Sequence, residues 1–254
     1  MQRYTKNDLS KVEQAARNNA ILCDTMCRAH GTSGEFHEAV WLNRHPVPRF
    51  YPNLITLSNQ GYYTVQLAHV QDLVTSSLPG HWAVKDSFCE LDLAAQAFQL
   101  VFEATWLWLA PSTLIPNGRG HGIQWVRLQD GSKLVKWETA WNDTPANSSS
   151  LQQPRLFLPS LLADPNIAFI AAYQGSEIIA GAIANRTDNV VGLSNIFAPP
   201  EDSASFWAGC VTTAKISFPG LPLVGYESGP ELALAEAVGF EKLQMLRVWA
   251  HQQQ

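Results

Sequence analysis

Residues 218–224 read FPGLPLV, and an alanine-rich segment, ELALAEAVGF, follows at residues 231–240. A Pro-Gly pair breaks one element and leads into the next, and the alanine-rich segment has the composition of a helix. Residues 78–98, LPGHWAVKDSFCELDLAAQAF, follow the same order about 140 positions earlier. Each copy then leads to an apolar run with a tryptophan near its end, Trp108 or Trp249. A repeat this long exceeds a solenoid period, so it predicts two related α/β modules in tandem.

The second copy belongs to a longer series of predicted elements. Three apolar runs separated by turn residues predict three consecutive antiparallel strands, and the first turn lies at residues 174–177. Apolar periodicity predicts the helices, with Leu134, Trp137 and Trp141 on one face of the earliest. The complete series is strand 124–128, helix 133–141, short helix 156–162, strands 167–173, 177–184 and 190–197, helix 203–217, strand 222–226, helix 230–238 and strand 243–251.

The first half of the chain has a shorter series and no three-strand meander. A Pro- and Gly-rich stretch at 111–122 predicts a linker, so we expect an N-terminal module at 1–115 and a C-terminal domain at 123–254. Within the N-terminal module we expect helix 10–30, an irregular loop at 31–53, strand 54–58, helix 64–77, strand 82–85 and helix 92–107.

The composition limits the classes of partner. Hydrophobic residues make up 46% of the 254 residues, which is enough to bury a substantial core. The net charge is −5 and the basic residues are scattered, so the clustered basic surface that binds nucleic acid is not expected. The first residues lack the apolar core of a signal peptide, and no apolar run approaches the roughly 18 residues of a spanning helix. We therefore expect a cytoplasmic protein with no membrane partner.

Four cysteines do not form a disulfide framework in a chain of this size. Cys23, Cys27 and His30 are spaced so that they would share one face of a helix over 10–30 and could approach a metal. A fourth ligand is not evident, and buried cysteine is usually a small core residue. We expect no metal site.

The order of strands and helices over 123–254, closed by the pair Gly239-Phe240, resembles the GNAT superfamily of CoA-dependent acyltransferases. The resemblance implies an α/β (α+β) fold, in which a mixed, mostly antiparallel sheet is flanked by helices. It also implies a tandem arrangement, with a degenerate GNAT-like copy at 1–115 that lacks the meander.

The resemblance implies where acetyl-CoA or another acyl-CoA would bind as co-substrate. In the family, the strand before the central helix carries a bulge, its backbone pairs with the pantetheine arm, and the next loop presents amides to the pyrophosphate. Unpaired amides and the helix dipole favour an anion at such a helix N-terminus. The matching positions are Ile196, Phe197 and Ala198 for the arm, and Ser203, Ala204, Ser205, Phe206 and Trp207 for the loop and first turn.

The loop at 199–207, PPEDSASFW, departs from the family pattern, which begins with Arg or Gln and carries glycines. Glu201 and Asp202 would repel a pyrophosphate, although acidic residues before a helix also serve as N-caps. Ser203 and Ser205 could still donate hydrogen bonds to phosphate. Residues 119–123, RGHGI, form a second glycine-containing loop, but a predicted strand and not a helix follows it.

Many family members place a proton-donating Tyr four residues before the glycine of the Gly-Phe pair, and this chain has Ala235 there. Tyr226 and Glu227, at the end of the strand over 222–226, are the nearest candidates for a catalytic acid and base. Tyr226 could equally be a packed ring with a satisfied hydroxyl.

The sequence therefore suggests a GNAT-like acyltransferase, an N-acetyltransferase in the first instance, that acts on an amine of a small molecule or peptide. Positioning and backbone amides supply much of such catalysis, so few catalytic side chains are required. One alternative is an inactive GNAT fold that serves as a ligand-binding or interaction module. Another is a GNAT fold with a different biosynthetic reaction. We expect a monomer or a homodimer.

Overall fold

The computed structural model describes residues 6–59, 61–76, 78–116, 122–144 and 154–251. The chain forms two compact units, one of Met1–Trp106 with Leu243–Gln254 and one of Leu107–Lys242. These bounds differ from the domains expected from the sequence, 1–115 and 123–254, because most of the last strand belongs to the first unit.

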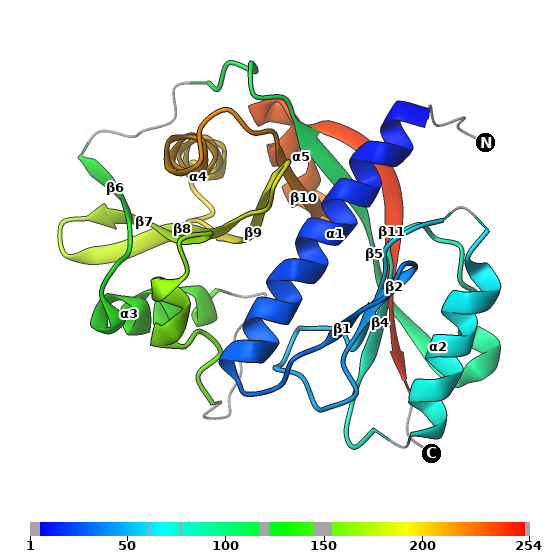
Figure 1. The fold of residues 1–254 in the computed structure, drawn as a ribbon. Helices are drawn as coiled ribbons and strands as arrows, with labels where there is room; N and C mark the ends of the chain where they lie inside the picture. Colours follow the sequence, from blue (N-terminus) through cyan, green and yellow to red (C-terminus); the bar gives the residue numbers. More distant parts are fainter. Residues whose placement is uncertain (1–5, 60, 77, 117–121, 145–153, 252–254) are drawn as a thin grey trace. The chain divides into compact units, whose positions relative to one another are not determined.

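The first unit contains a mixed sheet whose strands lie in the order β1-β2-β3-β4-β11-β5. Strands β3 and β4 are parallel, whereas β1 with β2, β2 with β3, and β4 with β11 are antiparallel. The elements, most of them labelled in Figure 1, are α1 (Lys6–Ala29), β1 (Glu35–Phe36), β2 (Val40–Leu42), β3 (Leu54–Thr56), α2 (Tyr63–Thr75), β4 (Ala83–Asp86), the 3-10 turn η1 (Ala94–Gln96), β5 (Phe98–Leu109) and β11 (Glu241–His251).

Two of the predictions for this half were wrong. The expected helix at 92–107 is only the 3-10 turn η1, followed by the long strand β5. Residues 98–109, FQLVFEATWLWL, are rich in aromatic and β-branched side chains, which fit a sheet better than a helix. The expected loop at 31–53 contains the short strands β1 and β2, with Trp41 fully buried.

The strands of the second unit lie in the order β10-β9-β8-β7-β6 and are antiparallel except for the pair β9 and β10. The strand, helix and turn order matches the expected series. The elements are β6 (Ile123–Arg127), α3 (Gly131–Asn142), η2 (Pro159–Ala163), β7 (Ile167–Gln174), β8 (Glu177–Arg186), β9 (Val191–Phe197), α4 (Ser203–Ser217), β10 (Leu223–Glu227) and α5 (Gly229–Val238).

Helices α3 and α4 cover opposite faces of this second sheet. Trp137 of α3 makes edge contacts with the rings of Phe169 and Phe197, from β7 and β9. The neighbouring residues of β7, Ala168 and Ile170, instead belong to the core cluster that contains α4. Successive side chains in a strand point to opposite faces, so the two sets define an α3 face and an α4 face.

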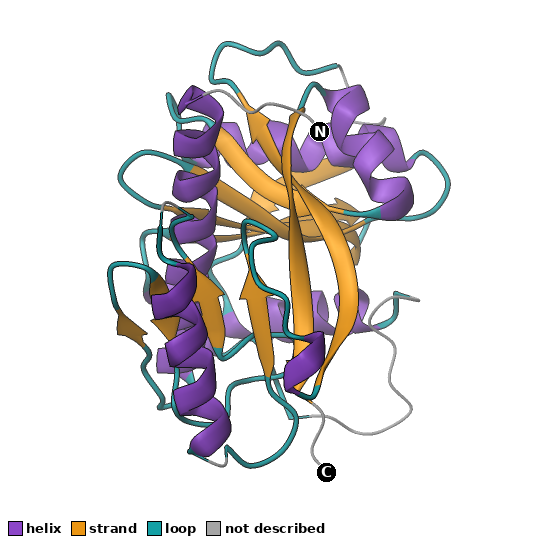
Figure 2. Ribbon diagram, turned by 90° about the vertical axis from the view of Figure 1, so that its right-hand side faces the viewer, coloured by secondary structure: helices purple, strands orange, loops and turns teal. Residues whose placement is uncertain are grey.

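Two glycines allow these helices to approach the sheet. A Cβ on Gly181 of β8 would lie 2.4 Å from Trp137 Nε1, and a Cβ on Gly209 of α4 would lie 2.1 Å from the Trp125 ring. Only a residue without a side chain fits at such distances. Figure 2 shows the helices, in purple, packed against the strands, in orange.

The structure confirms the expected fold class, a mixed α/β fold with a mostly antiparallel sheet and flanking helices. The Pro-Gly repeat also has a structural counterpart. Gly80 and Gly220 have φ of 77° and 81°, and β4 and β10 begin three residues after them. A common origin of the two copies stays a prediction. Among the described residues, no helix combines the length and hydropathy needed to cross a bilayer.

Candidate active-site cleft

The parallel strands β9 and β10 pair at one end only. Leu223 lies opposite Val191 and Val224 lies opposite Gly192, and no further register pairs occur between these strands in the described residues. At the next position Gly225 approaches the Leu193 carbonyl so closely that a Cβ would lie 2.7 Å from its oxygen. Beyond it no register pairs join residues 193–197 to 225–227 among the described residues; we call this region the β9–β10 cleft and the two segments its arms. An extended ligand can hydrogen-bond to backbone groups where two parallel strands stop pairing.

A β-bulge lies in the β9 arm of this cleft. Gly181 lies opposite Phe197 and Ile183 opposite Ser194, so Asn195 and Ile196 together face the single residue Ala182. Asn195 has a left-handed φ of 52°. The bulge expected from the family resemblance is therefore present. Because the bulge shifts the alternation of side chains, Phe197 contacts Trp137 on the α3 face and Ile196 packs on the α4 face.

The loop after β9 delivers the chain to the N-terminus of α4. Asp202 occupies the N-cap position with φ of 63°, and its carbonyl accepts hydrogen bonds from the amides of Ser205 and Phe206. Its carboxylate caps no backbone amide and instead accepts a hydrogen bond from Ser205 Oγ at 2.6 Å. Helix geometry leaves the amides of Ser203 and Ala204 without intrahelical acceptors, which favours an anion here. The carboxylates of Glu201 and Asp202 oppose this preference.

The residues expected to bind the co-substrate divide into two groups. Ile196, Phe197 and Ala198 lie at the end of the cleft arm, and Ser203 and Ala204 begin α4. Ser203 Oγ lies 2.8 Å from the Pro199 carbonyl and 2.9 Å from that of Pro200, so its proton is used within the loop.

The side chains of the other group make contacts within the protein. Trp207 is buried and contacts the Phe240 ring edge-on, and the Phe206 ring packs near Trp125. Ser205 donates its hydroxyl proton to Asp202. These three side chains support the start of α4 and do not present polar groups to the cleft.

Tyr226 and Glu227, the predicted acid and base, are neighbours on β10 and therefore point to opposite faces. Leu223 belongs to the core cluster on the α4 face, which places Glu227 on that face and Tyr226 on the α3 face. The structure does not bring the two side chains to one reacting atom.

Glu227 has an unusual protonation equilibrium. Desolvation by burial raises the pKa of this carboxyl to about 8, and the nearby Glu231 carboxylate adds to the effect. A carboxyl with such a pKa exchanges a proton near neutral pH. Ala235, at the position where family members place Tyr, is fully buried and offers no proton.

Ser194 is a candidate that the sequence analysis missed. Ser194 and Tyr226 each lie two residues beyond the last paired residue of their strand, and the partner of Ser194 on β8, Ile183, lies on the α3 face. Its Oγ is buried and finds no hydrogen-bond partner among the described residues. A buried hydroxyl without a partner is unusual and often marks a functional position. The signal in the sequence was a pair of polar residues, Ser194-Asn195, inside the apolar run VVGLSNIF.

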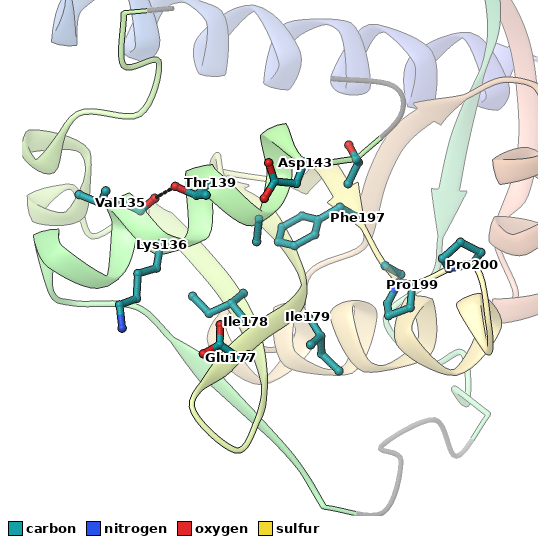
Figure 3. A pocket seen from close by; sticks show the side chains of 13 residues that line it. Val135, Lys136, Thr139, Asp143, Glu177, Ile178, Ile179, Phe197, Pro199 and Pro200 are labelled. Carbon is teal, nitrogen blue, oxygen red and sulfur yellow. Dashed lines mark hydrogen bonds between the residues drawn. The ribbon is translucent and has the colours of Figure 1, made fainter. Parts of the chain in front are cut away.

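A pocket of about 530 Å³ adjoins the β9 arm on the α3 face. It lies between the second half of α3, the start of β8 and the end of β9, and Phe197 belongs both to its wall and to the cleft (Figure 3). The lining residues are Val135, Lys136, Thr139, Ala140, Asp143, Thr144, Glu177, Ile178, Ile179, Phe197, Ala198, Pro199 and Pro200.

The remaining sequence candidates do not form a site. Cys23 and Cys27 are buried in α1, and desolvation raises their pKa to about 11 and about 12. His30 lies beyond the end of α1 and is exposed. Across the described residues, no three His, Cys, Asp or Glu side chains gather around a possible metal position. The loop at 119–123 lies mostly outside the described residues.

Comparison with solved structures identifies the class of fold. A GCN5-related N-acetyltransferase from Kribbella flavida matches with a TM-score of 0.60 and 10% identity, over 94% of this chain and 96% of that chain. A GCN5-related N-acetyltransferase from Sphaerobacter thermophilus matches with a TM-score of 0.57 and 9% identity, over 94% and 92%. A functionally unknown conserved protein from Staphylococcus epidermidis matches with a TM-score of 0.58 and 8% identity, over 84% of both chains.

The sequence itself matches no protein-family model and no curated protein sequence. The chain thus has the fold of the GNAT N-acetyltransferases, and the resemblance expected from residues 123–254 is confirmed at the level of the fold. At such low identity the likeness concerns the fold and not the reaction.

Proposed function

We propose that this protein is an acyltransferase that moves an acetyl or other acyl group from acyl-CoA to an amine of a small molecule or peptide. The observation that carries the proposal is the β9–β10 cleft, in which a bulged strand separates from its parallel partner and leads into the N-terminus of α4. This geometry offers backbone hydrogen bonds to an extended amide-containing arm and free amides to an anion at its end.

The residues around the cleft fit an acyl-CoA co-substrate in part. Backbone groups of Ile196 and Phe197 would pair with the pantetheine amides, and the amides of Ser203 and Ala204 would face the pyrophosphate. The end of the β9–β10 pairing at Gly192 and Val224 supports this assignment. The acidic pair Glu201 and Asp202 weakens the attraction for phosphate, so we expect modest affinity.

In the proposed reaction the neutral amine attacks the thioester carbonyl, the C–N bond forms and the C–S bond breaks. The amine loses one proton and the departing thiolate gains one. Ser194 and Tyr226 share the α3 face, and each lies two residues beyond the last paired residue of its strand, which supports a role for them in hydrogen-bonding the acyl oxygen or the leaving sulfur. Glu227 lies on the other face, where its pKa of about 8 suits proton exchange with solvent.

The second candidate function is an inactive GNAT fold that binds a ligand or a partner. The loop before α4 favours it, because two carboxylates border the anion position and both serine hydroxyls are used within the loop. A GNAT fold with a different biosynthetic reaction stays an alternative as well.

Calorimetric titration with acetyl-CoA and with free CoA tests the proposal, followed by thiol release in the presence of a panel of amines. Micromolar binding of acetyl-CoA with amine-dependent thiol release is the expected result. Binding without thiol release for any amine favours the inactive module. No binding at millimolar ligand would overturn the assignment of the cleft to acyl-CoA.

A further inference from the structure

The pocket beside the β9 arm has an uneven distribution of charge. In Figure 3, Asp143 lies on the side of the pocket near Phe197, and Lys136 and Glu177 lie farther from that ring. The charged lining residues are one lysine and two acidic residues, all exposed to solvent, so the lining has a net negative charge.

Asp143 is placed where a negative charge is intrinsically unfavourable. It is the C-cap residue of α3, where the helix carbonyls concentrate negative partial charge, and the last turn of α3 contains no basic residue. Asp143 forms no ion pair with any described residue, and residues 144–154 contain no Lys, Arg or His. A cation bound here would relieve both the carboxylate and the helix dipole.

The walls between these charged residues are apolar. Ile178 and Phe197 form part of the wall, and the Phe197 ring is held in place by its edge contact with Trp137. Pro199 adds a rigid apolar surface near the start of the loop. A volume of about 530 Å³ with apolar walls and a few charged groups is typical of a small-molecule site.

We infer that this pocket binds an organic amine in its protonated form, with the ammonium group at Asp143 and the apolar body against Ile178 and Phe197. The role of this ligand as acyl acceptor rests on the proposed function, because the pocket adjoins the α3 face on which Ser194 lies. In that role the ammonium would first transfer one proton to the Asp143 carboxylate and then attack as the neutral amine. The binding of the cation itself does not depend on acyl transfer.

Titration with three probes of nearly equal shape tests the inference: phenethylamine, the neutral 2-phenylethanol and the anionic 3-phenylpropanoate. We expect phenethylamine to bind at least about tenfold more tightly than the alcohol, a difference of about 1.4 kcal/mol, and the carboxylate to bind least. In Asp143→Asn this preference should disappear. Lys136→Gln is the matched control and should retain the preference or increase it. Equal binding of amine and alcohol, or an unchanged preference in Asp143→Asn, would overturn the inference.

Acetyl-CoA titration of the same variants separates this inference from the proposed function. If acetyl-CoA binds the wild type and Asp143→Asn equally, and the affinity for phenethylamine is also the same in both, the pocket assignment fails and the cleft assignment stands. If acetyl-CoA does not bind but phenethylamine binding depends on Asp143, the acyltransferase proposal fails and the cation pocket stands.

Discussion

The two parallel strand pairs, β3 with β4 and β9 with β10, are built in the same order and end differently. In each, a strand is followed by a helix, a Pro-Gly turn and a parallel strand. Strands β3 and β4 stay joined beyond their paired residues, because the Ser87 amide donates to Thr56 Oγ1 at 2.8 Å. The Asp86 carboxylate accepts from the Leu91 amide at 2.8 Å and closes the following turn.

At the corresponding end of β9 and β10 the residues after the Pro-Gly turn are Gly225, Tyr226 and Glu227 in place of Lys85, Asp86 and Ser87. Gly225 allows the closest approach at the base, and the bulge at Asn195 then turns β9 away. Side chains that hydrogen-bond the strand ends close a parallel pair, whereas a glycine and a bulge leave it open. The proposed binding cleft therefore depends on the absence of side chains that would join the two strand ends, as well as on the residues that are present.

The largest effect is expected from Gly225→Val, which places side-chain atoms against the Leu193 carbonyl at the base of the open pair. Overpacking against backbone should destabilise the protein by about 3 kcal/mol and weaken acetyl-CoA binding at least tenfold. Urea unfolding and calorimetric titration measure the two effects. Gly131→Ala, whose Cβ would have only ordinary contacts, is the control and should keep both properties. Wild-type binding by Gly225→Val would show that the base of the cleft does not determine its shape.

The next largest effect is expected from Thr56→Val in the closed pair. This change keeps the shape of the side chain but leaves the buried Ser87 amide without an acceptor, at a cost of about 2 kcal/mol. Urea unfolding measures the loss. Acetyl-CoA binding should be unchanged, and a parallel loss of binding would mean that the two pairs do not act separately.

A smaller, pH-dependent effect is expected from Glu227→Gln. The folded protein holds a proton on Glu227 up to pH of about 8, whereas the unfolded chain releases it near the ordinary pKa of 4.5. The folded state thus binds more protons in this window, and its stability falls as pH rises from about 5 to 8. The variant removes this loss and should be more stable than the wild type at pH 8 by about 1 kcal/mol, allowing for partial solvent screening.

Urea unfolding of the wild type and Glu227→Gln at pH 5 and pH 8 provides the measurement. Glu236→Gln, which alters an exposed ion pair with Lys242, is the control and should show little change in its pH dependence. Equal pH slopes for the wild type and Glu227→Gln would contradict the raised pKa.

The smallest effect on stability is expected from Ser194→Ala, because the hydroxyl that is removed has no partner among the described residues. The free energy of unfolding should change by less than about 0.5 kcal/mol. If Ser194 hydrogen-bonds the reacting group, kcat/KM should fall about tenfold, the value of one hydrogen bond. Ser176→Ala, in the exposed β7–β8 turn, is the control for both measurements. An unchanged kcat/KM would exclude Ser194 from the reaction.

Much of the second unit could be predicted from local patterns in the sequence. Helix α4 has the bounds 203–217 that were expected, and Leu134, Trp137 and Trp141 of α3 are buried together. Helical periodicity and turn residues act over a few positions, so one sequence is enough to reveal them. The family resemblance added the bulge in β9, which periodicity does not show.

Other features could not be predicted, because they depend on partners distant in the sequence. The alanine-rich residues Ala94 to Ala97 led to the prediction of a helix that extended to residue 107. Residues 98–109 instead form strand β5, because they pair with neighbouring strands. The positions of Ser194 and Tyr226, each two residues beyond the last paired residue of its strand, follow from the register of β9 with β10. The pKa of Glu227 follows from desolvation in the folded chain.

The sequence by itself determined the order of elements in 123–254, the Pro-Gly turns and the positions of the candidate side chains. Tertiary structure alone decided that one parallel pair is closed and the other open, that Tyr226 and Glu227 face opposite sides, and that Asp143 lies beside a pocket. The physical reason is the distance along the sequence over which each kind of interaction acts. Backbone propensity and periodicity are local, whereas strand register, desolvation and the shape of a pocket arise only when separate segments pack together.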